Sequence, residues 1–458
     1  MRDSTAPGDL VALWQGNDGV DQRTARAVID LAMRVGETLL ATGASASDVV
    51  ATALRLIDAY GLRSVHVDVT FTSISVSYHR GPDADPMTVM RGIKVRSTDL
   101  TRLERLQTLV RDIAEEPVEI DVARARFDDL IRAPHPYRRW VVTASLAGLA
   151  AGAAALFGGS WLIMALSFVT TAVADRAQHW LAHRGIAAFF TQAAGGAIPT
   201  GVAVALLAAA SAGVPGLQEI SPSVVVASGI VVLLAGLSAV GAAQDAIDGY
   251  YVTAGARVFE VLVLTLGIVV GIAAVLAIAR RSGVSMQLTA DTPLAANTVV
   301  QVLAAMVVSG MFAVSAYAGT RTVAYSTVMG GLGWLVYLGA TGLSLGPVAA
   351  SALAALAAGF LSQLVSSRLR VPALALSMAA IVPLLPGLVV YRGLFEIVQR
   401  APGEGLSTGL TTLLGAGGIG MGLAAGVSMG TFLARPIRTE LDRGQRRALR
   451  RAAGDARE

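Results

Sequence analysis

Residues 381–397 read IVPLLPGLVVYRGLFEI, an apolar helix pattern that is interrupted and then resumes. The helix breakers and the charges that follow them are Pro383, Pro386, Gly387, Arg392 and Glu396. Proline removes a backbone donor and clashes with the preceding helical turn, so a regular helix does not run through both prolines. Within a membrane, unpaired backbone is tolerated only where protein covers it or where it lines a cavity. The stretch therefore predicts a discontinuous membrane helix, with a simple packing kink as the alternative.

The composition of the whole chain predicts a membrane protein. Of its 458 residues, 54% are hydrophobic and 15% are charged. A membrane helix needs about 20 apolar residues. Stretches without Asp, Glu, Lys or Arg lie at 141–174, 185–218, 220–244, 261–279, 292–320, 322–367, 371–391 and 405–434. Because 141–174 and 322–367 are each long enough for two helices, we predict ten transmembrane helices.

The N-terminal part of the chain is polar and has no apolar run that could cross a bilayer. Residues 24–60 have the periodicity of two amphipathic helices, and 64–81 alternate as strand, bend and strand. A short strand near 87–93 and helices at 97–113 and 119–134 follow. We therefore predict an α+β domain. Because no signal peptide opens the chain, we expect this domain to stay in the cytoplasm.

Arginines beside the apolar runs predict the orientation. Arg138 and Arg139 precede the first span and a basic tail follows the last, so both termini are expected in the cytoplasm. The predicted organisation is a disordered tail at 1–22, the cytoplasmic domain at 23–138, five-helix modules at 139–282 and 292–436, and a basic cytoplasmic tail at 437–458.

The two modules resemble one another in sequence. Residues 230–274 align without a gap with 381–425, with 12 identities in 45 positions. The alignment places Gly236 over Gly387 and Asp245 over Glu396. Because five spans per copy is an odd number, the second copy would be inverted in the membrane. Inverted repeats with discontinuous helices are typical of secondary transporters, whose substrate site lies near the bilayer midplane.

Ionisable residues in or beside the spans, together with the helix breaks, form the predicted substrate and proton pathway. They are Asp175, Asp245, Asp248, Glu260, Arg392 and Glu396, with Gly236, Pro383, Pro386 and Gly387. A charge held in hydrocarbon costs at least ~2.5 kcal/mol on insertion scales, so it usually faces a cavity or a partner. For the aspartates a place at the cytoplasmic interface is the alternative. For Glu260 the alternative is an ion pair with Arg257, one turn away.

Arg392 and Glu396 stand four residues apart on one predicted helix face. They can pair with each other or hold the two ends of a zwitterion. We expect Asp245 or Glu396 to exchange a proton, because a carboxylate in a dry cavity can carry one across.

Other kinds of site have weaker support. His66 and Asp68, two apart on one strand face, are a candidate metal or hydrolytic pair. A solvated strand face is the alternative, favoured by the lack of an HExxH, GxSxG or P-loop motif. The chain has no cysteine, which excludes thiolate sites. No nucleic-acid partner and no cofactor are expected; the expected partners are lipid and a small-molecule substrate, and homo-oligomerisation stays open.

Five segments resemble the bacterial threonine/serine exporter family: GETLLATGAS (36–45), YGLRSVHVDVTFTSISV (60–76), ARARFDDLIRAPHPYRRW (123–140), LFGGSW (156–161) and GAAQDAIDGYYVTAGAR (241–257). The resemblance extends from about residue 24 to 434 and covers both modules. It implies an inner-membrane carrier, not an enzyme, that exports small hydroxy amino acids and is driven by the proton motive force.

Three alternatives to a proton-coupled exporter of threonine and serine stay open from the sequence. Relatives with split modules are associated with dicarboxylate export, which makes a small dicarboxylate the second candidate substrate. A passive channel would give flux without proton coupling. A membrane-anchored hydrolase with its chemistry at His66 and Asp68 is the least favoured.

Overall fold

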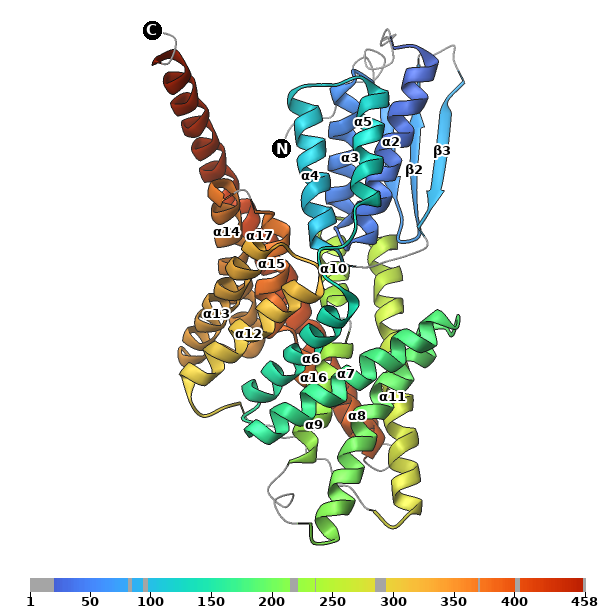
Figure 1. The fold of residues 1–458 in the computed structure, drawn as a ribbon, viewed down its shortest axis with the longest axis vertical. Coiled ribbons are helices and arrows are strands. Elements are labelled where there is room, and N and C mark those ends of the chain that lie inside the picture. The colour runs from blue at the N-terminus through green and yellow to red at the C-terminus, as the bar shows by residue number, and fades with distance from the viewer. Residues whose placement is uncertain are drawn as a thin grey trace. The chain divides into compact units, whose positions relative to one another are not determined.

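The computed structural model describes residues 20–80, 85–93, 98–214, 221–234, 236–284, 294–369, 371–399 and 404–455 (Figure 1). The predicted tail at 1–22 lies almost wholly outside them. The chain forms two compact units. The polar unit comprises the described residues up to Pro136 together with Asp245–Arg257, and the helical unit comprises Tyr137–Gln244 and the described residues from Val258 onward.

In the residues that the structure describes before Pro136, the polar unit contains a small antiparallel sheet and four helices (Figure 1). In chain order its elements are α2 (Gln22–Ala41), α3 (Ala46–Ala59), β1 (Val65–Val69), β2 (Ser73–Tyr78), β3 (Met87–Gly92), α4 (Leu100–Glu115) and α5 (Ile120–Arg132). The strand order is β1-β2-β3, with Val76 opposite both Val67 and Val89. The buried face of β2 and the apolar stripe of α2 form its core.

Side-chain caps fix where the helices of the polar unit begin. Ser45 precedes α3 and accepts from the backbone N–H of Asp48 at 3.2 Å. Asp99 precedes α4 and accepts from the N–H of Arg102 at 2.9 Å. These bonds satisfy donors that the first turn of a helix leaves without an intrahelical partner.

The helical unit is built from consecutive helices joined by short connections. Its elements are α6 (Arg139–Leu156), α7 (Trp161–His183), α8 (Ala188–Ser211), α9 (Pro222–Leu233), α10 (Gly236–Ile247), α11 (Tyr251–Arg281), α12 (Thr298–Ser315), α13 (Thr320–Gly342), α14 (Pro347–Leu369), α15 (Ala373–Ile381), η1 (Val382–Leu384), α16 (Gly387–Gln399) and α17 (Glu404–Asp455). The last residues of α10 and the first of α11 belong to the polar unit.

Seven helices of the described chain are long and apolar enough to cross a membrane, and an eighth span results if α9 and α10, bent by 46°, count as one. The seven are α6, α8, α11, α12, α13, most of α14, and residues Ser407–Pro436 of α17. Ten spans were predicted. The other two segments of the prediction correspond to α7, which carries Asp175 and Arg176, and to the short apolar helix Ala373–Leu384 with α16.

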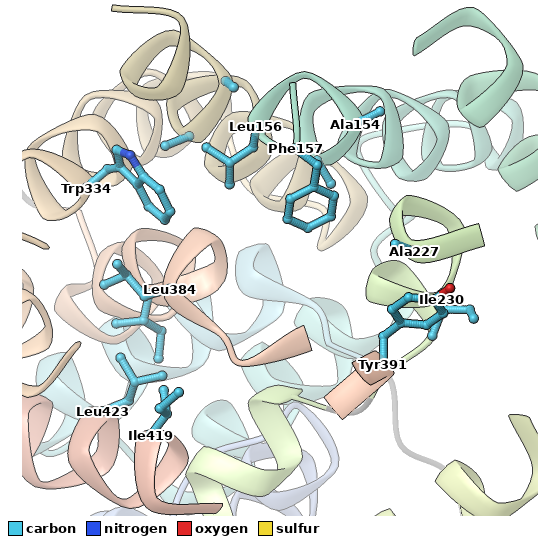
Figure 2. Close-up of a cluster of buried hydrophobic side chains, with 14 of the residues drawn as sticks. Ala154, Leu156, Phe157, Ala227, Ile230, Trp334, Leu384, Tyr391, Ile419 and Leu423 are labelled. Atoms are coloured by element: carbon cyan, nitrogen blue, oxygen red, sulfur yellow. The ribbon is translucent and has the colours of Figure 1, made fainter. Parts of the chain in front are cut away.

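A continuous apolar core joins the two halves of the helical unit (Figure 2). Its labelled side chains come from α6 and the residue after it, α9, α13, η1, α16 and α17: Ala154, Leu156, Phe157, Ala227, Ile230, Trp334, Leu384, Tyr391, Ile419 and Leu423. Large apolar side chains also cover the outside of this unit; Leu414 is 75% exposed and Phe259 is 68% exposed. Such surfaces suit lipid rather than water as the solvent. The protein is therefore a membrane protein with a mostly helical, multi-span architecture.

Candidate functional site

Two discontinuous helices occur in the helical unit. The first is broken between α9 and α10, and the second between η1 and α16. At each break the N–H of a glycine donates to the carbonyl two residues before it: Gly236 to Leu234 and Gly387 to Leu385, both at 2.8 Å. This tight turn ends one helix segment and begins the next. The prediction of a broken helix at Pro383, Pro386 and Gly387 is confirmed.

The two breaks pack against each other. A Cβ added to Gly236 would lie 2.9 Å from Leu385 Cδ1, and one added to Gly387 would lie 3.0 Å from Val231 Cγ2. Both glycines therefore permit a close approach that a larger residue would push apart. Sequence reasoning singled out both positions, and the structure brings them together.

A small cavity adjoins the first break. It has a volume of about 110 Å³ and is lined by Leu146 of α6, Thr171, Asp175 and Gln178 of α7, Gln192 of α8, and Val232 and Leu233 of α9. Since a single water needs only about 10–15 Å³ of such space, the cavity can hold a small molecule of several atoms. We call it the α7 cavity.

The polar wall of the α7 cavity carries one charged side chain, Asp175, and that charge is paired. Asp175 forms an ion pair with Arg139 and accepts a hydrogen bond from Thr143 Oγ1 at 2.7 Å. Its side chain is 12% exposed. Gln178 donates to the backbone carbonyl of Thr191 at 3.1 Å and to the Gln192 amide oxygen at 3.4 Å. The cavity thus offers one carboxylate, which is paired with Arg139 from outside the lining, and two amides beside an apolar wall.

Sequence reasoning found only Asp175 among these polar residues. Thr171, Gln178 and Gln192 are uncharged, and isolated polar residues within apolar runs are common enough to pass unnoticed. Spacing is the signal that could have found them, because Thr171, Asp175 and Gln178 follow one another at four and then three residues and so share one helix face.

Asp245 and Asp248 lie in the polar unit, where they meet the start of α3. The buried Asp245 carboxylate accepts from the backbone N–H of Ala46 at 2.8 Å and pairs with Arg257 at 3.2 Å. Asp248 is exposed and accepts a hydrogen bond from Ser47 Oγ. Burial, followed by the charges of Asp248 and Asp245, raises the pKa of the nearby Tyr250, so this phenol stays neutral. Asp245 therefore has structural partners already, and its position favours an anchoring role.

The remaining predicted residues lie on α11 and α16. Glu396 is half-buried and accepts a hydrogen bond from Thr412 Oγ1 of α17 at 2.8 Å. Arg392 and Glu260 are half-buried as well. The α7 cavity is lined by none of the three.

The candidate metal pair lies on the open face of strand β1. His66 and Asp68 are both exposed, while Val67 and Val69 between and beside them are buried. In the described ranges, no group of three or more His, Cys, Asp or Glu side chains is arranged to hold a metal ion. The arrangement matches a solvated strand face.

Comparison with known proteins identifies the family. The chain matches the family model of the threonine/serine exporters over residues 30–279, and a second model described as "Threonine/Serine exporter, ThrE" over residues 301–429. It is 40% identical over 427 residues to the "Probable threonine/serine exporter" of Mycobacterium tuberculosis. This alignment covers 92% of this chain and 79% of that protein.

A second relative gives the same family. The chain is 33% identical over 428 residues to the "Threonine/serine exporter" of Corynebacterium glutamicum. This alignment covers 92% of this chain and 85% of that protein. No solved structure matches the chain. The family consists of transporters rather than enzymes. On the extent of these matches, the chain belongs to the threonine/serine exporter family.

Proposed function

We propose that this protein exports threonine and serine across the bacterial inner membrane and that the α7 cavity receives the substrate. The observation that carries the proposal is a helix break beside a cavity whose one carboxylate is paired with an arginine, in a chain whose relatives are named threonine/serine exporters. A broken helix beside a small polar cavity is the arrangement by which secondary transporters hold small solutes.

The charges of the cavity favour a zwitterion. Asp175 can accept the ammonium group of an amino acid, and Arg139 can donate to its carboxylate. Because these two charges cancel, a substrate without net charge leaves the site neutral. A dicarboxylate would add two negative charges beside Asp175, which disfavours the alternative substrate.

The architecture we propose is ten transmembrane helices in two inverted modules. The helix bounds support a repeat: α6 and α12 both have 18 residues, α7 and α13 both have 23, and α8 and α14 have 24 and 23. A discontinuous helix then follows in each half. Five helices per module place the second module upside down, as the sequence predicts.

Helix packing after each break supports the same equivalence. Gly271 of α11 faces the backbone oxygen of Ala193 in α8, and Gly426 of α17 faces that of Ala352 in α14; a Cβ at either glycine would collide with that oxygen. Each of the two contacts joins the third helix of a module to its last. Small residues permit this approach in membranes.

The proposed orientation places both termini on the cytoplasmic side. Leu146 lies seven residues after Arg139, or about 10 Å along α6. Asp175 lies a similar distance before the end of α7 at His183. The cavity is therefore nearer to the arginine-flanked ends of these helices, where an exporter would load its substrate.

We propose that a proton moves in exchange for the exported amino acid, with Glu396 as its carrier, since Asp245 is already engaged with Ala46 and Arg257.

Efflux of radiolabelled threonine from loaded proteoliposomes tests the function. Threonine efflux that falls when the proton gradient is collapsed supports a coupled exporter, and Glu396→Gln should lose the same dependence. Flux indifferent to the gradient would favour a channel, and no threonine flux at all would overturn the proposal.

A further inference from the structure

Thr171 has an unusual place on the wall of the α7 cavity. It is 3% exposed, and its hydroxyl has no hydrogen-bond partner within the part of the chain that the structure describes. A buried helical threonine commonly donates to the carbonyl one turn before it, as Thr200 does to Gly196 at 2.8 Å. Since buried hydroxyls are almost always bonded, an unpaired one on a residue that lines a cavity calls for an explanation, and a ligand's polar group would supply the partner.

Thr171 differs from other buried hydroxyl residues of the helical unit that have no hydrogen-bond partner among the described residues, because it lines a cavity. Ser309, Ser326 and Ser362 are buried without a partner in the described chain as well. The wall of the α7 cavity includes none of these serines. Thr171 combines both features, and the serines supply matched controls.

The second module carries aromatic side chains at two of the three corresponding positions. When the sequences of α7 and α13 are aligned from their first residues, Thr171, Asp175 and Gln178 correspond to Gly330, Trp334 and Tyr337. The rings of Trp334 and Tyr337 lie 5.2 Å apart, and Trp334 Nε1 donates to Gln301 at 3.2 Å. Trp334 is 4% exposed in the apolar core (Figure 2). The polar cavity is therefore a feature of the first module.

We propose that Thr171 hydrogen-bonds the side-chain hydroxyl of the transported amino acid and that it selects hydroxy amino acids over analogues without that hydroxyl. The inference rests on the proposed function and names the specificity residue of its site. One helical turn separates Thr171 from Asp175, so a substrate held by Asp175 and Arg139 extends its side chain toward Thr171. Leu146 and Val232 supply the apolar wall for the methyl group of threonine.

Competition between two amino acids tests this role. L-2-aminobutyrate is threonine without its hydroxyl, and both are offered as competitors of radiolabelled threonine efflux. The wild-type protein should favour threonine by about three- to tenfold, the value of one neutral hydrogen bond. Thr171→Val keeps the shape but removes the hydroxyl, and should lose this preference. Thr171→Ser and Ser362→Ala should both retain it.

Each outcome decides the inference. A Thr171→Val protein that still prefers threonine as strongly as the wild type overturns it, and so does a Thr171→Ser protein that loses the preference while still transporting. If Thr171→Val does not reach the membrane, loss or retention of the preference in Thr171→Ser decides. A wild-type protein that moves no threonine would instead contradict the proposed function, so the two failures are distinct.

Discussion

Asp175 links the charge of the α7 cavity to its proposed substrate. Its carboxylate, 12% exposed, is held by Arg139 and Thr143, and its replacement by Asn removes the partner of a substrate ammonium. Because charged hydrogen bonds contribute about 1.5–3 kcal/mol, we expect threonine efflux by Asp175→Asn to fall at least about tenfold. Asp121→Asn, at a side chain 71% exposed in the polar unit, is the control and should transport normally. Wild-type efflux by Asp175→Asn would remove this residue from the site.

The residues around Asp175 also mark a limit of sequence reasoning. A search for charges inside apolar runs finds Asp175, because burying a charge is costly and so demands a reason. Thr171 and Gln178 carry no charge, and the same search passes over them. Their importance depends on the cavity beside α9, and this cavity forms only when helices distant in the chain pack together.

Gly271 of α11 and Gly426 of α17 determine how closely the last helix of each module packs against the third. A Cβ at Gly271 or Gly426 would collide with a backbone oxygen of the facing helix, which cannot move aside as a flexible side chain can. We expect Gly271→Ala and Gly426→Ala each to destabilise the protein by about 1–3 kcal/mol, measured as a lower midpoint of thermal unfolding in detergent. Gly415→Ala on α17 meets no atom within 4 Å and is the control. Equal midpoints for all three would contradict the packing.

Most of the individual elements could be predicted. Alternating valines and the capped amphipathic patterns in residues 24–134 correspond to β1, β2 and the helices α2 to α5. Proline and glycine chemistry located the second break, and the internal alignment located the first at Gly236. The connection between the two breaks could not be read from the sequence, because the contact of Gly236 with Leu385 depends on three-dimensional packing.

The turn between α10 and α11 connects distant parts of the chain. Asp245 accepts from the N–H of Ala46, 199 positions earlier, and Arg257 donates to the carbonyl of Ala44 at 2.8 Å. The local sequence pattern around Asp245 does not indicate a partner near Ala46, so the sequence predicts Asp245 as a residue of the transport pathway. The buried pair with Arg257 and the N-terminus of α3 explain its burial instead.

Removal of this carboxylate should loosen the polar unit. Arg257 is 6% exposed, and Asp245→Asn would leave its charge buried without the carboxylate, at a cost of about 3–5 kcal/mol. The expected result is faster proteolysis within residues 20–136 of the full-length protein. Asp248→Asn removes an exposed carboxylate from the same turn and should change the rate little. Identical rates for both variants would argue against an anchoring role of Asp245.

The absence of cysteine from the chain allows a direct test of where the substrate binds. Leu146→Cys places the single thiol of the protein on the wall of the α7 cavity, and Leu345→Cys places one in the connection between α13 and α14 as the control. The rate of maleimide labelling is measured with and without substrate. We predict that threonine and serine slow the labelling of Cys at position 146, that succinate does not, and that the control is unaffected. Labelling at position 146 that is the same with and without threonine would contradict the α7 cavity as the substrate site.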